Sequence, residues 1–215
     1  MAFAPASVTV KAFTMTAVTN AVRPRSPYAS NTVAYDFMGG YWKAQIDLPP
    51  LTDAAGAAVE AWLLGLNGPK GTFQMYDFNP AGPFGTAIND ATLKLDAPER
   101  STAIRIQQVH TAASPSLVLN FAGNGRLGYL FGELAPGDTI TLAGFLHRVV
   151  SAAPVGGLGA QDITVWPRLR VNMVAGDPVV IAMPYGTWAL AMPENGWSRS
   201  DRATRAQSIE IVEAF

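Results

Sequence analysis

Four aspartates beside predicted turns are the first candidates for catalytic side chains in this sequence. They are Asp77, Asp138, Asp162 and Asp177. Two carboxylates at a fixed separation form the catalytic pair of a glycoside hydrolase, so this set first suggests glycan cleavage. Aspartate also favours turns for a structural reason, because its side chain hydrogen-bonds to nearby backbone groups. That reason alone explains the Gly-Asp and Gly-Asp-Pro sequences at Asp138 and Asp177, and we therefore favour the structural interpretation.

The other groups that could bind a metal or attack a substrate are few. The chain has two histidines, His110 and His147, and neither has another histidine or a carboxylate at metal-ligand spacing. It has no cysteine and no Gly-x-Ser-x-Gly nucleophile motif. The glycines at 68–71 and 156–159 lack the spacing of phosphate-binding and dinucleotide-binding loops. We therefore predict a protein that is not an enzyme and that holds no metal or cofactor.

Four residues near the end of the chain are candidate contact residues for a partner. Arg199, Arg202 and Arg205 recur every three residues before the last predicted strand. One interpretation is a solvated loop in which Asp201 offsets part of the charge, and the other is an interface or the cationic lining of a pore. Trp197 lies in a polar stretch, where a large aromatic side chain suits an interface or a ligand contact, with plain packing as the alternative.

The composition limits the classes of partner. Hydrophobic residues are 49% of the chain, charged residues are 14%, and the net charge is −1. Average proteins carry about 25% charged residues, so the shortfall indicates a large core or a surface that partners cover. A net charge near zero argues against sequence-specific nucleic-acid binding or attachment to a membrane surface. The chain has neither a spanning apolar run nor a secretory signal, so we expect synthesis in the cytoplasm.

The spacing of turn residues predicts a mainly β protein. Glycine and proline, 20 and 16 residues, gather in clusters between short β-favouring runs, as in sandwiches and barrels. Two alternating runs, 31–38 and 41–48, flank Gly39-Gly40 and predict a hairpin, with Val33, Tyr35 and Phe37 on one face of the first run. Further strand-like runs are 7–15, 71–78, 102–109, 116–121, 127–134, 139–142, 145–150, 162–166, 179–183, 186–192 and 207–212.

One amphipathic helix is predicted between Pro49-Pro50 and the stop signal Asn67-Gly68-Pro69. Thr52 is the candidate N-cap, and Asp53 in the first turn is favourable to the helix dipole. The residues that share one face at helical spacing are Ala55, Val59, Trp62, Leu63 and Leu66. A single helix in a β protein packs across a sheet or closes its open end.

Strand lengths divide the chain into two units. Residues 1–109 and 183–215 are predicted to form a β-sandwich that carries the helix. Residues 110–182, with shorter and more tightly turned strands, are predicted to form an inserted small β-barrel.

Three stretches resemble the distal tail protein family of long-tailed bacteriophages. The first is Tyr41-Trp-Lys-Ala-Gln-Ile-Asp-Leu-Pro-Pro-Leu-Thr52, a strand that ends in Leu-Pro-Pro and leads into the helix. The second is Ala61-Trp-Leu-Leu-Gly-Leu-Asn-Gly-Pro-Lys-Gly-Thr-Phe73, a helix end followed by a strand. The third runs from 134–140 through 145–149 to 165–170. Together they cover well under half of the chain, and their order is more specific than any one of them.

The resemblance implies a structural virion protein of the tail tip. Members of that family form a ring, commonly a hexamer, between the tail tube and the baseplate or tip hub. Their N-terminal β-sandwich builds the ring and a peripheral β domain projects outward. The expected partners are therefore further copies of this chain, the tail tube protein and the tip hub protein, with tail fibres or the tape measure protein as further contacts. Another tail-tip or tube component is a neighbouring assignment, because such proteins share β-sandwich units.

A carbohydrate-binding module for host attachment is the competing function. It would stack a sugar on Trp197 or Trp166. In the family that the chain resembles, the outer domain can be galectin-like, but residues 110–182 are short for such a domain. A structural ring component is therefore the preferred prediction.

Overall fold

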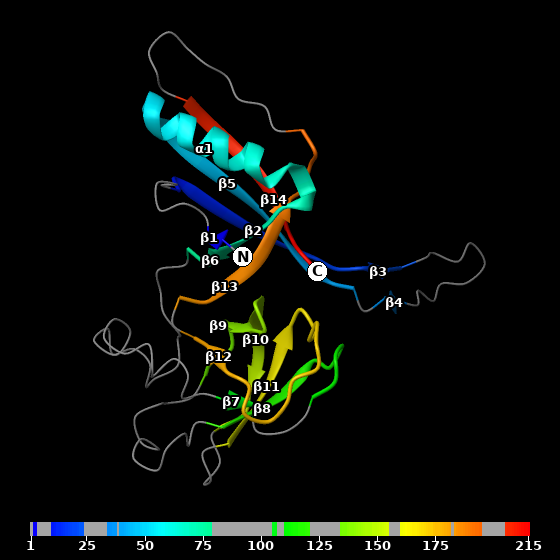
Figure 1. Cartoon of the computed structure of the whole chain (residues 1–215). Helices are drawn as coiled ribbons and strands as arrows, with labels where there is room; N and C mark the ends of the chain where they lie inside the picture. The colour runs from blue at the N-terminus through cyan, green and yellow to red at the C-terminus, as the bar shows by residue number, and fades with distance from the viewer. Residues whose placement is uncertain are drawn as a thin grey trace, which may run out of the picture.

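The computed structural model of the chain describes residues 2–3, 10–23, 34–37, 39–78, 105–106, 110–120, 134–154, 160–181, 183–194 and 205–215. Over these residues the protein is mainly β with one α-helix, which confirms the predicted fold class at that level. The strands form two six-stranded sheets and a separate two-stranded ribbon (Figure 1). No helix in the described part of the chain is both long and apolar enough to cross a lipid bilayer.

The first sheet combines strands from both ends of the chain. In spatial order it contains β1 (Ala2–Phe3), β6 (Thr72–Tyr76), β13 (Tyr185–Leu190), β14 (Arg205–Glu213), β5 (Tyr41–Leu51) and β2 (Ala12–Val18). β1 runs parallel to β6, and the other neighbours are antiparallel. The two late strands lie between the early strands β6 and β5, so the last part of the chain completes a sheet that the first part begins.

The core of the first sheet follows from the alternation in β5. Side chains two residues apart share a face of a strand, and the buried positions of β5 are Trp42, Ala44, Ile46 and Leu48. Phe13 of β2 lies edge-on to Trp188 of β13 with 6.4 Å between ring centroids, although β14 and β5 separate these strands in the sheet. The sheet therefore curls toward a half-barrel around its own apolar face.

Helix α1 (Asp53–Leu66) packs on this core as predicted. Val59 and Leu63 are buried, and the other three residues of the predicted face are half-buried against the same cluster. Thr52 has the N-cap position with an extended backbone, but its side chain makes no capping hydrogen bond. The helix ends at Asn67, which adopts the left-handed conformation that asparagine tolerates.

The second sheet has its own core. Its spatial order is β12 (Val179–Val180), β9 (Thr139–Leu142), β10 (Phe145–Ala152), β11 (Ala160–Trp166), β8 (Ser116–Asn120) and β7 (Arg105–Ile106). The predicted turn at Ala143-Gly144 joins β9 to β10, and both residues have positive φ, as a tight hairpin turn requires. β7 pairs with β8, so the second sheet begins before residue 110, where we had placed the start of the second unit.

The predicted hairpin of 31–38 with 41–48 is wrong. β4 (Tyr35–Asp36) pairs with β3 (Ala21–Val22), whereas β5 pairs with β2 and β14. Gly39-Gly40 makes no tight turn, and the chain passes through it from β4 into β5. The result is one long hairpin, in which β2 and β3 lie opposite β5 and β4. The tip and Val33 lie outside the described residues.

We call residues 19–23 and 34–37 the arm. In the described structure its strands pair only with each other, and they extend away from both large sheets (Figure 1). Asn20 donates a hydrogen bond from its side chain to the Gly39 carbonyl at 3.2 Å, which ties the base of the arm across the hairpin.

Two glycines near the end of α1 give a matched test of this packing. A Cβ on Gly71 would collide with the Leu66 carbonyl, whereas a Cβ on Gly65 would meet no atom within 4 Å. We predict that Gly71→Ala lowers the free energy of unfolding by about 1–3 kcal/mol. Gly65→Ala should raise it by about 0.5–1 kcal/mol, because alanine favours helix over glycine. Urea unfolding measures both, and equal effects would contradict the packing.

Candidate functional site

The role of the four predicted contact residues stays a prediction. Trp197, Arg199 and Arg202 lie outside the described residues. Arg205 is the first residue of β14, and its backbone lies opposite Leu51, but its side chain is not described. The arginine-rich segment therefore leads directly into the centre of the first sheet.

Two of the four candidate aspartates shape turns. Asp138 accepts a hydrogen bond from the Ala135 amide at 2.7 Å, and Asp177 accepts one from the Val174 amide at 2.8 Å. Both agree with the turn interpretation. Asp77 accepts a hydrogen bond from the Thr139 hydroxyl at 3.1 Å, and Asp162 is exposed on β11.

Both histidines have structural hydrogen bonds. His110 accepts one at Nε2 from the Val118 amide at 3.1 Å. His147 is buried, and its Nδ1 donates to the Pro167 carbonyl at 2.7 Å. Burial lowers the pKa of His147 to about 4, although the bond to Pro167 acts in the opposite direction. Among the described residues, no three His, Asp or Glu side chains group as metal ligands would.

Trp42 joins the two large sheets. Its ring lies edge-on to Trp166 of β11, with 4.5 Å between centroids and 86° between planes. Its indole N–H donates to the Leu146 carbonyl of β10 at 2.9 Å. A side chain of the first sheet thus packs against one strand of the second sheet and hydrogen-bonds to its neighbour.

A buried ion pair lies beside Trp42. Arg170 donates to Glu213 of β14 at 2.8 Å and to the Gly40 carbonyl at 2.6 Å, and the same Glu213 oxygen accepts from the Trp42 amide at 3.1 Å. The two side chains are 15% and 2% exposed. Burial raises the pKa of Glu213, and its bond to Arg170 opposes that rise. We call Trp42, Leu146, Trp166, Arg170 and Glu213 the junction.

A second set of bonds joins β13 to the β9–β10 hairpin. The Thr141 hydroxyl donates to the Tyr185 carbonyl at 2.6 Å and accepts from the Tyr185 amide at 2.6 Å. The Thr187 hydroxyl donates to the Gly144 carbonyl at 2.9 Å. Together with the junction, these bonds hold the two sheets in one arrangement.

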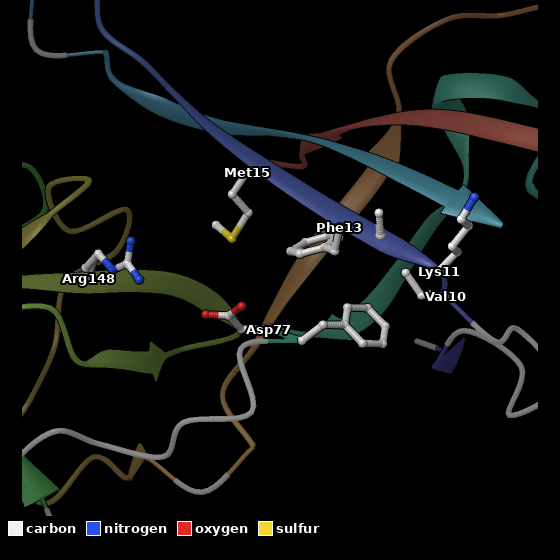
Figure 2. A pocket seen from close by; sticks show the side chains of 8 residues that line it. Val10, Lys11, Phe13, Met15, Asp77 and Arg148 are labelled. Carbon is white, nitrogen blue, oxygen red and sulfur yellow. The ribbon is translucent and has the colours of Figure 1, made fainter. Parts of the chain in front are cut away.

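An open pocket of about 510 Å³ lies where the two sheets meet. Its walls come from β2 and the residues before it, the two residues that follow β6, and β10 (Figure 2). The lining residues are Val10, Lys11, Ala12, Phe13, Met15, Asp77, Phe78 and Arg148. The ring centroids of Phe13 and Phe78 lie 5.3 Å apart. Lys11 and Arg148 bring positive charge to the lining, and Asp77 brings negative charge. The lining therefore combines aromatic and aliphatic surface with charged groups of both signs.

Sequence reasoning did not identify the junction. Its members are far apart in the chain, and no local spacing pairs Glu213 with Arg170. One signal was available, because Glu213 continues the period-two series of the buried Ile209 and Ile211. A charged residue at an inward position requires a partner.

Comparison with known proteins identifies no family for this chain. No protein-family model matches it, and no curated protein matches it either.

The junction ion pair should matter more to stability than a surface pair of the same sheet. We predict that Arg170→Ala lowers the free energy of unfolding by about 3 kcal/mol, because it leaves a buried carboxylate without its cation. Lys43 is the matched control, since it pairs with Glu210 at 2.9 Å with side chains 43% and 41% exposed. Lys43→Ala should cost less than about 1 kcal/mol. Chemical denaturation measures both, and similar losses would contradict the role of the junction.

His147 should make the fold sensitive to acid. Its pKa is about 4 in the folded chain against 6.5 for the ordinary group, so the unfolded chain binds the proton more readily between these values. Stability should therefore fall as the pH drops from 6.5 to 4, by about 3 kcal/mol. His147→Asn keeps a donor for the Pro167 carbonyl but cannot titrate. Thermal unfolding across this range should show a smaller loss in the variant, and an identical loss would contradict the assignment.

Proposed function

We propose that this chain is a structural virion protein of a phage tail tip. Copies of it form a closed ring, commonly a hexamer in the family it resembles, that joins the tail tube to the baseplate or tip hub. The proposal rests on three stretches that resemble the distal tail protein family and occur in the same order along the chain. It also rests on apolar surface that a single copy exposes to water.

The observation that carries the proposal is the apolar face of the arm. Val22, Tyr35 and Phe37 are 52%, 53% and 66% exposed. Val22 lies directly opposite Tyr35, and Phe37 is two residues further along, so all three share one face. An isolated two-stranded ribbon is at best marginally stable in water, and apolar patches at the surface mark contacts. A partner that covers this face would resolve both problems.

Helix α1 offers a second uncharged surface. Its only described acidic side chain, Glu60, is buried, and its outward positions are Ala54, Ala57, Ala58, Ala61, Leu64 and Gly65. A helix at an ordinary solvent-facing position carries polar residues on its outer face. This surface fits a subunit whose low charge reflects contacts with neighbours.

The two units would divide the work. The first unit, predicted as residues 1–109 and 183–215, would form the ring as a β-sandwich. The second unit, predicted as residues 110–182 and extended by β7 of the second sheet, would project from it as an inserted small barrel. The pairing of β13 and β14 between β6 and β5 supports this division, because it makes the intervening segment a return excursion of the chain. The segment with Trp197, Arg199, Arg202 and Arg205 is the proposed contact for the tube or hub.

The carbohydrate-binding alternative has less support. Trp166, one of its two sugar platforms, packs edge-on against Trp42 in the junction. A sugar would have to compete with that contact for the ring.

Native mass spectrometry at high protein concentration tests the proposal. We expect a single closed oligomer. The absence of any oligomer larger than a dimer would contradict the proposal. A glycan array is the control for the alternative, since a structural ring protein should give no glycan binding. Binding that Trp197→Ala abolishes would favour the attachment module.

A further inference from the structure

We infer that the arm of one copy docks into the pocket beside β2 of a second copy. The inference rests on the proposed ring and identifies the contact that would build it. The donor is the apolar face of the arm, Val22, Tyr35 and Phe37. The acceptor is the pocket formed by β2 with the residues before it, the two residues that follow β6, and Arg148 (Figure 2).

The pocket adjoins an open strand edge. β2 is the last strand of the first sheet, and among the described strands only β5 pairs with it. The other edge of an outer strand presents backbone donors and acceptors to an incoming strand. An extended segment can therefore add to β2 through its backbone while alternate side chains enter the pocket.

The chemistry of the two surfaces matches. The pocket offers the rings of Phe13 and Phe78 and the thioether of Met15, which suit two aromatic side chains. Charge can contribute too, because the pocket carries Asp77 and the arm carries Arg23.

The arm cannot fill the pocket of its own chain. Phe13 and Val22 belong to one side of the same long hairpin, nine residues apart. At about 3.3 Å per residue the extended strand holds them about 30 Å from each other. The arm also points away from the sheets (Figure 1). The occupant that we infer is therefore the arm of a second copy.

This geometry decides the kind of assembly. The arm and the pocket are different surfaces, so each copy gives one contact and receives another. Such a heterologous contact produces a ring when its rotation closes and a filament when it does not. A two-fold dimer would instead use the same surface on both copies.

Cysteine cross-linking tests the contact cleanly, because the chain has no cysteine of its own. We expect the double variant Phe37→Cys/Met15→Cys to form a ladder of disulfide-linked multimers under mild oxidation. Lys11→Cys in place of Met15→Cys should give the same ladder from an exposed position that does not disturb the core. Mixing a Phe37→Cys chain with a Met15→Cys chain should yield linked heterodimers and nothing larger.

Phe37→Cys/Val150→Cys is the matched control, since Val150 is 56% exposed on β10 and lies outside the pocket lining. A ladder no stronger than this control, in a protein that still forms a closed oligomer, would overturn the docking and leave the ring intact. A chain that is monomeric by native mass spectrometry would overturn the ring as well. As a second readout, Phe37→Ser should weaken self-association at least about tenfold, as loss of a buried aromatic contact does.

Discussion

The Arg170–Glu213 ion pair fixes how the two sheets of this protein stand to each other. Glu213 lies on a central strand of the first sheet, and Arg170 follows the last long strand of the second. Removing one partner of such a buried pair leaves an uncompensated charge, which costs about 3–5 kcal/mol. The cost of burial is visible in the raised pKa of Glu213. The Trp42 amide and the Gly40 carbonyl provide further hydrogen bonds that offset part of this cost.

The surfaces that we assign to assembly depend on this arrangement. The pocket takes Phe13 from the first sheet and Arg148 from the second, so it depends on the junction and on the bonds of Thr141 and Thr187 that hold the sheets together. The arm is the outer part of the long hairpin that also contains Gly40 and Trp42. A Cβ at Gly40 would press into the Trp166 ring, so the close approach of the hairpin to the second sheet requires glycine there. The junction therefore positions the acceptor surface and the root of the donor surface together.

The sequence predicted the local elements well and the long-range pairings poorly. The helical spacing of Val59 and Leu63 located α1, and Ala143-Gly144 located the β9–β10 turn, because both signals are contained in a few neighbouring residues. The runs on both sides of Gly39-Gly40 do form strands, but a glycine pair permits both a turn and an extended passage of the backbone. Pairing with strands far along the chain selects the extended passage. Glu213 and Arg170 could not be paired from sequence, since nothing local records which side chain a buried carboxylate meets. The turn interpretation is confirmed for Asp138 and Asp177, because turn chemistry is also local, whereas Asp162 lies within β11.

The central claim is that this chain acts by assembling with copies of itself through an arm that its own fold leaves unpartnered. In this account a neighbouring copy covers the exposed aromatic side chains of the arm and pairs with the open edge of β2. Electron microscopy of the purified protein at high concentration tests this most directly. The account predicts uniform closed rings, with Phe37→Ser reducing their number. A field of single small particles, for the unaltered chain and in the presence of tail tube protein, would contradict it.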